Sequence, residues 1–205
     1  FVTSASYWAN SGVLCGQNRR PKANRHALRL AVALQADGSV TEWKSVKWAF
    51  SRKRKADRLR TLLNAARVPF KEAQHRNGKY GFVTAFAVKA KDARPFVRQL
   101  DQKMLSWSWL SLPEWARRIV LDEAQYWDSH RRQDGRYSFS SFKQQNLDVL
   151  QAIAAITGHK SRIGHRQLSV QKQSGSKGGN VSARTSRYTK DVACLSVPSS
   201  FVLVR

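Results

Sequence analysis

Two apolar segments of this chain have the residue spacing of buried helices, and each ends on a single aspartate. The first, HALRLAVALQADGSV, ends at Asp37, and the second, EWARRIVLDEAQYWDSH, ends at Asp128. The two aspartates lie 91 residues apart (128 − 37), and the segments that follow them are similar. A duplicated plan restricts the chain to folds in which two related halves pack together with a twofold-like relation.

The first half predicts a helix, a hairpin, a second helix and a second hairpin. Asn24 is a suitable N-cap for the first helix, whose apolar residues recur at i, i+3, i+4 and i+7. The Arg-Asn-Gly-Lys sequence at 76–79 is a strong hairpin-turn signal. The expected segments are a helix over 25–36, a hairpin over 40–52, a basic helix over 54–67, a strand that starts at 68–70, a return strand over 80–89 and a third helix over 92–105.

The second half repeats this plan. Ser111 and Glu114 have the spacing of a capping box, with Pro113 in the first helical turn. Leu62 and Leu150 occupy comparable places, 88 residues apart (150 − 62). The expected segments are a helix that runs to about Trp127, a turn at 133–136, a strand over 137–142, a helix over 143–156 and a hairpin over about 160–195 with its tip at 174–180. The expected domains are a lead-in segment 1–24, a first half 25–106, a second half 107–195 and a C-terminal tail 196–205.

The charge of the chain indicates the class of its partner. Its 37 Lys and Arg residues outnumber its 13 Asp and Glu residues, which gives a formal net charge of +24. Such an excess repels itself in the folded protein and is usually balanced by a polyanion. Nucleic acid is the expected polyanion, and its binding should weaken steeply as salt rises.

Several other classes are disfavoured. No apolar run approaches the roughly 18 residues that span a bilayer, and no signal-peptide pattern opens the chain. The two cysteines, Cys15 and Cys194, lie far apart and lack the spacing of a zinc site or a disulfide scaffold. A reducing compartment therefore fits the chain better than an oxidising one.

Two stretches resemble a known family. Leu30–Gly38 reads LAVALQADG, which matches the motif that names the LAGLIDADG homing endonucleases at five of nine positions. Ser138–Ile163 resembles the strand and helix that follow the second motif of that family. The resemblance implies an α+β fold of two pseudo-symmetric αββαββ(α) halves. Their antiparallel β-sheets would form a DNA-binding saddle, with the two motif helices packed at the centre.

The resemblance also implies a function, a site-specific double-strand DNA endonuclease. Asp37 and Asp128 would be catalytic residues and ligands of two or three Mg²⁺ ions, with Ala36 and Trp127 as further metal ligands. Oxygen ligands suit Mg²⁺, and the ions would lower the pKa of an attacking water and stabilise charge on the leaving oxygen. The resemblance further implies a catalytic basic side chain near the leaving phosphate, from the last strand of each half, and Lys89 and Lys190 are the candidates. Gln35 is a candidate to orient water or to pack within the helix.

The second motif departs from the family pattern at two positions. Ser129 replaces the final glycine, and Glu123 stands where a small residue usually allows close helix contact. These departures keep open an alternative, a catalytically inactive or maturase-like DNA- or RNA-binding module of the same fold. A structural basic protein of the ribosome or nucleoid type is a third interpretation.

The hairpins are the expected DNA-binding surfaces, because a two-stranded ribbon fits the major groove. Most of the basic side chains there should contact phosphates and position the protein. Trp43 and Trp48 are candidates for stacking on bases, although core packing is the more frequent role of tryptophan. The candidate DNA-binding residues are Lys44, Lys47, Arg52, Arg131, Arg132, Arg136, Arg166, Gln167 and Gln171.

The C-terminal stretch Val192–Arg205 resembles the segment that leads from such an endonuclease back into the splicing part of phage-type inteins. The resemblance implies the endonuclease part of an intein, acting as a monomer on a long site in double-stranded DNA, with no membrane partner. We expect it in the cytoplasm of a bacterial or phage-infected cell. The chain holds no N-terminal nucleophilic Cys or Ser and no C-terminal His-Asn pair, so we do not expect it to splice by itself.

Overall fold

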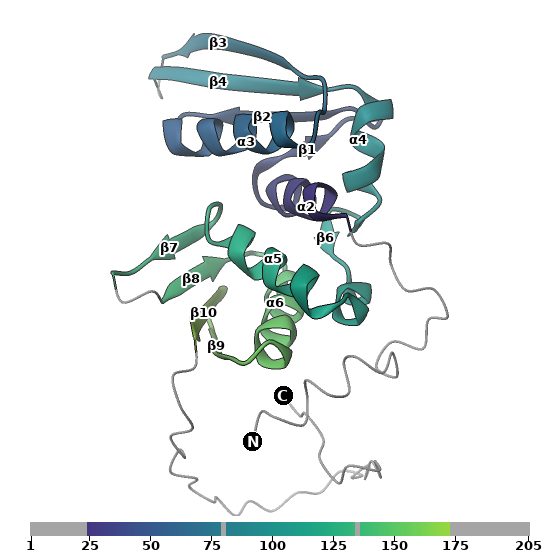
Figure 1. The fold of residues 1–205 in the computed structure, drawn as a ribbon. Helices are drawn as coiled ribbons and strands as arrows, with labels where there is room; N and C mark the ends of the chain where they lie inside the picture. Colours follow the sequence, from purple (N-terminus) through teal and green to yellow (C-terminus); the bar gives the residue numbers. More distant parts are fainter. Residues whose placement is uncertain (1–23, 79–80, 134–135, 173–205) are drawn as a thin grey trace, which may run out of the picture.

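The computed structural model describes residues 24–78, 81–133 and 136–172, which form two halves that lie one above the other in Figure 1. Each half contains a four-stranded antiparallel sheet. Helices α2 (Arg25–Asp37) and α5 (Glu114–Ala124) pack against each other between the two halves. The fold is therefore α+β, with the two apolar, aspartate-ended segments at its centre.

The first half continues from α2 into a sheet of strand order β1-β2-β4-β3. Its remaining elements are β1 (Ser39–Val40), β2 (Val46–Phe50), α3 (Lys53–Ala65), β3 (Lys71–Asn77), β4 (Gly81–Val88) and α4 (Ala90–Val97). A short hairpin and a 3-10 helix connect the halves: β5 (Leu100–Asp101), β6 (Met104–Leu105) and η2 (Trp107–Ser111).

The second half has the same topology, with strand order β7-β8-β10-β9. Its elements after α5 are β7 (Ser129–Arg131), β8 (Tyr137–Ser140), α6 (Gln144–Ile156), β9 (His159–Gly164) and β10 (Gln167–Lys172). The 91-residue offset between Asp37 and Asp128 also relates α3 to α6 and β2 to β8. The duplication predicted from the sequence is thus present in the order of elements, but the residue that corresponds to Leu150 is Leu59 and not Leu62.

Helix α2 is buried along most of its length because it contacts α3, α4 and α5. Asn24 caps it as predicted, since its Oδ1 accepts from the backbone N–H groups of His26 and Ala27 at 3.0 Å. Trp48 of β2 is also buried, and its Nε1 donates to the backbone oxygen of Ala33. Of the two candidate stacking tryptophans, Trp48 therefore belongs to the core, whereas Trp43 is 84% exposed.

The third helix predicted over 92–105 is wrong beyond Val97. Helix α4 ends there, and the chain forms the β5–β6 hairpin. The turn of that hairpin holds Gln102 and Lys103 at φ of 46° and 65°, a left-handed conformation that a continuing helix excludes. Pro95 within α4 also removes one backbone donor from the helix.

The predicted boundaries of α5 differ at both ends. Pro113 is the cap residue and makes no side-chain cap bond, while the Ser111 hydroxyl donates to the backbone oxygen of Ser108. The predicted capping box is therefore absent. The helix ends at Ala124, and the chain then turns through Trp127 to reach β7.

The structure places a turn within the predicted first strand of the hairpin over about 160–195. Strands β9 and β10 form a hairpin whose turn lies at His165 and Arg166, where Arg166 has a φ of 53°. The tip predicted at 174–180 lies outside the described residues, as do Tyr80 and the turn residues 134–135. Strand β3 begins at Lys71, three residues after the predicted start at 68.

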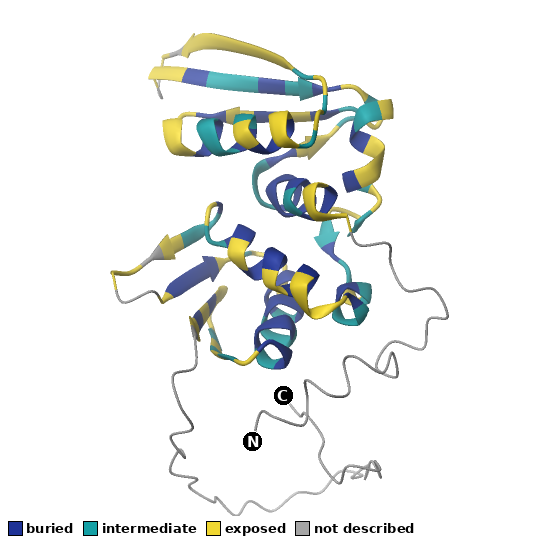
Figure 2. Ribbon diagram, viewed as in Figure 1, coloured by how far each residue is buried: buried dark blue, intermediate teal, exposed yellow. Residues whose placement is uncertain are grey.

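Figure 2 shows how burial is distributed over these elements. The dark-blue residues concentrate on the helices between the sheets, whereas residues 71–76 of β3 are exposed. Among the described residues, no helix has both the length and the apolar character that crossing a membrane requires.

Candidate functional site

Asp37 and Asp128 converge on one ammonium group at the junction of the halves. The Nζ atom of Lys55 lies 2.6 Å from Oδ2 of Asp37 and 3.2 Å from Oδ1 of Asp128. Asp37 is the last residue of α2, and Asp128 stands between α5 and β7. The structure therefore brings the two predicted aspartates together, one from each half.

Lys55 is the functional candidate that sequence reasoning missed. It lies in the first turn of α3 and is 8% exposed, which is unusual for a lysine. It precedes Leu59, Leu62 and Leu63 by four, seven and eight residues, which places it on the buried face of the helix. That spacing could have separated Lys55 from its neighbours Lys53 and Arg54, which are exposed.

The electrostatics of this pair favour a further cation. Burial raises the pKa of the Asp128 carboxyl, and the nearby carboxylate of Asp37 raises it further. The ammonium group of Lys55 acts in the opposite direction. A carboxyl whose charge is disfavoured by burial and by a second carboxylate is stabilised when a cation binds beside it.

An open cleft of about 860 Å³ surrounds Asp128 and Lys55, and we name it the central cleft. Ala36 and Trp127, the residues before the two aspartates, contribute to its lining. Gln35 also lines it and is 8% exposed, and its Oε1 atom has no hydrogen-bond partner within the described protein. An unpaired buried oxygen of this kind is unfavourable unless a ligand or water supplies a donor.

The two carboxylates suit a hard divalent ion such as Mg²⁺. Among the described residues, no three His, Cys, Asp or Glu side chains form a cluster that could hold an ion. Mg²⁺ is commonly bound through one or two carboxylates together with water and substrate phosphate. Asp37 and Asp128 could supply those carboxylates, with the backbone oxygens of Ala36 and Trp127 beside them.

The pseudo-symmetry of the site is broken at Lys55. The 91-residue offset relates Lys55 to Asn146 at the same position of α6. Asn146 is 1% exposed, and its Oδ1 accepts from the backbone N–H of Leu105 while its Nδ2 donates to the Ser141 hydroxyl. Asn146 therefore has a structural role, and in the part of the chain that the structure describes, Lys55 is the side chain that forms ion pairs with both aspartates.

Glu123 joins the halves on the other side of the helix pair. It is fully buried, and its carboxylate accepts hydrogen bonds from Arg29 and Arg58 of the first half and from Nε1 of Trp127. The Arg29 Nη1 to Oε2 distance is 2.6 Å. Glu123 stands where the family pattern has a small residue that allows close helix contact. Here its carboxylate is buried between the helices, and hydrogen bonds from Arg29, Arg58 and Trp127 stabilise it there.

The two residues that follow the aspartates also differ for a physical reason. A Cβ at Gly38 would lie 2.5 Å from Cδ1 of Leu34 and 2.7 Å from Nε1 of Trp48, so α2 requires glycine there. At the equivalent place after Asp128, the Ser129 hydroxyl donates to the backbone oxygen of Ala124 at 2.7 Å. Serine is accepted in the second half because it caps the end of α5.

Lys89 and Lys190 were the candidate catalytic lysines, and the structure places neither of them, within the residues that it describes, beside Asp37 and Asp128. Lys89 is exposed at the start of α4 and lines a different groove, together with Lys91 and Asp92. Lys190 lies outside the described residues. Lys55 is the lysine that the structure places beside the two aspartates.

Seven of the nine candidate DNA-binding residues line one of three grooves. Arg52, Arg166 and Gln167 line the central cleft. Lys47 lines a groove of about 470 Å³ on the first sheet, which also contains Asp37 and which we name the first-sheet groove. Arg132, Arg136 and Gln171 line a groove of about 290 Å³ on the second sheet, the second-sheet groove. Lys44 is exposed before β2, and Arg131 lies in β7.

Comparison with solved structures identifies the fold. The N-terminal LAGLIDADG domain of DUF199/WhiA superposes with a TM-score of 0.51 at 8% sequence identity, and the match covers 84% of this chain and 84% of that chain. Full-length DUF199/WhiA from Thermatoga maritima gives a TM-score of 0.53 at 10% identity, over 84% of this chain and 57% of that chain. The homing endonuclease I-DmoI in complex with DNA and Ca gives 0.49 at 11% identity, over 72% and 82% of the two chains.

No protein-family model matches the sequence, and no curated protein matches it. The structural matches nevertheless establish that the chain has the LAGLIDADG fold. The chain spans 57% of full-length DUF199/WhiA.

Proposed function

We propose that the protein is a site-specific double-strand DNA endonuclease, which hydrolyses phosphodiester bonds with divalent metal ions held between Asp37 and Asp128. One observation carries the proposal: carboxylates from equivalent points of two related halves meet at a buried lysine, beside an open cleft. A carboxylate from each half is the arrangement needed to act on both strands of a duplex whose pseudo-dyad coincides with that of the protein.

The charge and shape of the molecule support DNA as the substrate. Its net charge is +24, and cationic side chains line the central cleft and the grooves of both sheets. Neutralising phosphates releases condensed counterions, which drives binding of such a surface to a duplex. Two grooved sheets on either side of one catalytic centre also fit a long site better than a short one.

Each central residue has a distinct role in this proposal. Asp37 and Asp128 would hold the ions, and the bound ions would supply an activated water and stabilise the charge that develops on the phosphate and the leaving oxygen. Lys55 balances the two carboxylates and offers an N–H donor to a phosphate oxygen that enters the cleft. Gln35 lines the cleft, and its buried, unpaired Oε1 would accept a hydrogen bond from a water molecule and orient it.

We also propose the context inferred from the sequence. Two related halves in one chain supply a complete site, so a monomer is sufficient. The division at 106 and 107 places one aspartate in each half. The tail at 192–205 lies outside the described residues, and its resemblance to phage-type inteins is the ground for proposing an intein endonuclease that acts on DNA in the cytoplasm.

A DNA- or RNA-binding module without nuclease activity is the second candidate. The observation that favours it is Lys55, because its ammonium group contacts both carboxylates. In that case the lysine would be a permanent substitute for the ion, and the central site would only position the duplex.

Selection followed by cleavage separates the two candidates. Duplexes would be selected from a randomised library by the full chain in Ca²⁺, cloned into a plasmid, and then incubated with the protein in Mg²⁺. We expect linear plasmid with the wild type and none with Asp37→Asn, while both bind the selected duplex. If wild type and variant bind equally and neither linearises the plasmid, the nuclease proposal is lost and the binding module stands.

A further inference from the structure

The first sheet presents a floor of alanine methyl groups on the face opposite its helices. Strand residues that pair across an antiparallel ladder lie on the same face. Ala85 of β4 pairs with Ala49 of β2 on one side and with Ala73 of β3 on the other. In β2 the flanking residues Trp48 and Phe50 are buried on the helix side, so Ala49 faces outward.

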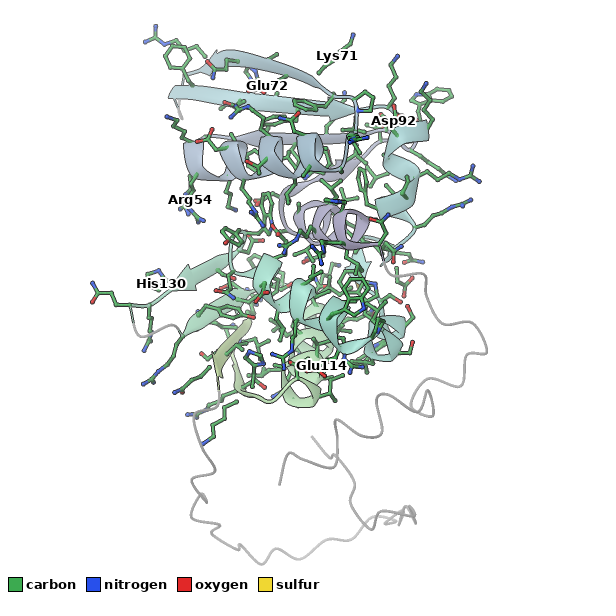
Figure 3. All side chains as sticks on the ribbon, viewed as in Figure 1. Arg54, Lys71, Glu72, Asp92, Glu114 and His130 are labelled. Carbon is green, nitrogen blue, oxygen red and sulfur yellow. The ribbon has the colours of Figure 1, made fainter. Side chains whose placement is uncertain are left out.

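The next row across the same face adds positive charge. Ala87 of β4 pairs with Lys47 of β2 and with Lys71 of β3. All four alanines and both lysines line the first-sheet groove, and Asp37 lines it as well. Figure 3 shows Lys71 projecting outward from β3, away from the helices. The groove is therefore an apolar floor between two cations, continuous with the catalytic aspartate.

The equivalent face of the second sheet is polar. Gln167 of β10 pairs with Ser140 and with Gly164, and Ser169 pairs with Ser138 and with Arg162. Ser140 lies 91 residues after Ala49 and in the corresponding strand of the second sheet, so the two residues are equivalent. By the same pairing, Gln167 takes the place of Ala85, and Ser169 takes the place of Ala87. The two halves thus share a backbone and differ in the chemistry of their outward faces.

This difference determines what each sheet can recognise on DNA. In the major groove the thymine 5-methyl group is the apolar feature of a base edge, and alanine is one of the side chains that contact it. An alanine methyl has no hydrogen-bonding group, so it offers nothing to the donors and acceptors of guanine or cytosine. Serine, glutamine and arginine instead form hydrogen bonds with base edges.

We propose that the first sheet selects a thymine-rich half-site through contacts of Ala49, Ala73, Ala85 and Ala87 with 5-methyl groups, whereas the second sheet reads its half-site by hydrogen bonds. The inference rests on the proposed function, because it takes a duplex as the occupant of both grooves. Lys47 and Lys71 favour a DNA duplex in the first-sheet groove. They lie on either side of the alanine floor, where they could contact the phosphates on either side of a base edge.

Uracil replacement tests the proposal, because deoxyuridine lacks only the 5-methyl group. The probes are the duplex selected by the full chain in Ca²⁺ and two versions in which every thymidine of one half-site is deoxyuridine. Burial of one methyl is worth about 0.8 kcal/mol, so each lost contact should raise Kd about fourfold. We expect the change for one half-site only, and the other substituted duplex should bind as the parent does.

Matched variants assign the effect to a sheet. Ala85→Ser places a hydroxyl on the floor and should remove most of the uracil sensitivity of that half-site. Ser140→Ala, at the equivalent row of the second sheet, should leave that sensitivity unchanged. Both positions face outward, so neither substitution should lower the unfolding temperature.

The outcomes are distinguishable from those of the nuclease test. A duplex that is selected and cleaved, but whose binding is insensitive to uracil in both halves, overturns the recognition proposal and leaves the nuclease intact. Uracil sensitivity that persists unchanged in Ala85→Ser also overturns it. If the wild type selects no duplex sequence at all, site-specific binding is lost and both proposals are lost with it.

Discussion

Asp37 and Asp128, from equivalent points of the two halves, bind the same ammonium group, with carboxylate oxygens 2.6 and 3.2 Å from Nζ of Lys55. The lysine side chain is 10% exposed, and the two aspartate side chains are 23% and 37% exposed. The three groups therefore form a partly dehydrated cluster at the junction of the halves.

Replacing Lys55 with Met should destabilise the metal-free protein, because it leaves two carboxylates together without a cation. Since both aspartates retain contact with solvent, we expect a loss of about 1–3 kcal/mol in the free energy of unfolding. Urea denaturation in EDTA measures this loss. Added Ca²⁺ should restore more stability to Lys55→Met than to the wild type, because the ion no longer competes with the ammonium group.

Lys53→Met is the matched control, since Lys53 lies on the exposed side of the same helical turn. It should change the free energy of unfolding by less than about 0.5 kcal/mol. Equal effects of the two substitutions would contradict a central role for Lys55.

Asp128→Asn should stabilise the metal-free protein at neutral pH. The pKa of Asp128 is raised in the folded state, so the folded protein holds this proton more tightly than the unfolded chain does. Ionising the group therefore lowers stability, and the loss develops as pH rises through the interval between the unfolded and the folded pKa. Below the ordinary carboxyl value of 3.8 the group is protonated in both states, and the difference between wild type and variant should disappear.

Thermal unfolding in EDTA over a pH series checks this sign. Asp101→Asn, at an exposed position of β5, is the control and should show no such trend. A variant Asp128→Asn that is less stable than the wild type at neutral pH would show that the Lys55 contact outweighs the cost of burial.

Glu123→Gln should be strongly destabilising. The substitution removes a fully buried charge that accepts from two arginines, and leaves those guanidinium groups without a counter-ion. Breaking a buried pair of this kind costs about 3–5 kcal/mol. Glu114→Gln, which affects a solvent-exposed pair with Arg118 four residues along α5, should have a much smaller effect in the same urea measurement.

Gln35→Met separates a positioning role from a packing role. Because Oε1 of Gln35 has no partner in the described protein, its removal sacrifices no hydrogen bond, and the free energy of unfolding should change by less than about 1 kcal/mol. If the oxygen orients water at the cleft, kcat for cleavage should fall by about 10- to 100-fold with KM for DNA unchanged. A large loss of stability with normal kcat would instead make Gln35 a packing residue.

The sequence predicted which helices and strands form better than it predicted the residues at which they begin and end. Periodicity and the cap at Asn24 located α2, and the same 91-residue spacing located the two aspartates. The β5–β6 hairpin was missed because Gln102 and Lys103 adopt a left-handed turn, a conformation that neither residue type prefers. The turn at Arg166 was missed for the same reason, since a glycine-rich segment further along gave the stronger turn signal.

Of the three residues at the centre of the site, the two aspartates could be predicted from the sequence and Lys55 could not. The aspartates follow from the motif, whereas Lys55 lies among several similar basic residues, and the contact of one lysine with both aspartates depends on how the two halves pack. Glu123 illustrates the converse. From the sequence, Glu123 at a position for small residues put close packing of the two motif helices in doubt. In the folded protein, Arg29 and Arg58, which are distant in sequence, form ion pairs with its carboxylate.

Strand-resolved cleavage of the selected duplex tests the central claim most directly. With the two strands labelled by different dyes, wild-type protein in Mg²⁺ should cut both strands. Asp37→Asn and Asp128→Asn should each bind the duplex in Ca²⁺ and fail to produce the double-strand break, and EDTA should abolish cleavage by the wild type. Cleavage by the double variant Asp37→Asn, Asp128→Asn at the wild-type rate, or cleavage by the wild type that survives EDTA, would contradict a metal-dependent site between the two aspartates.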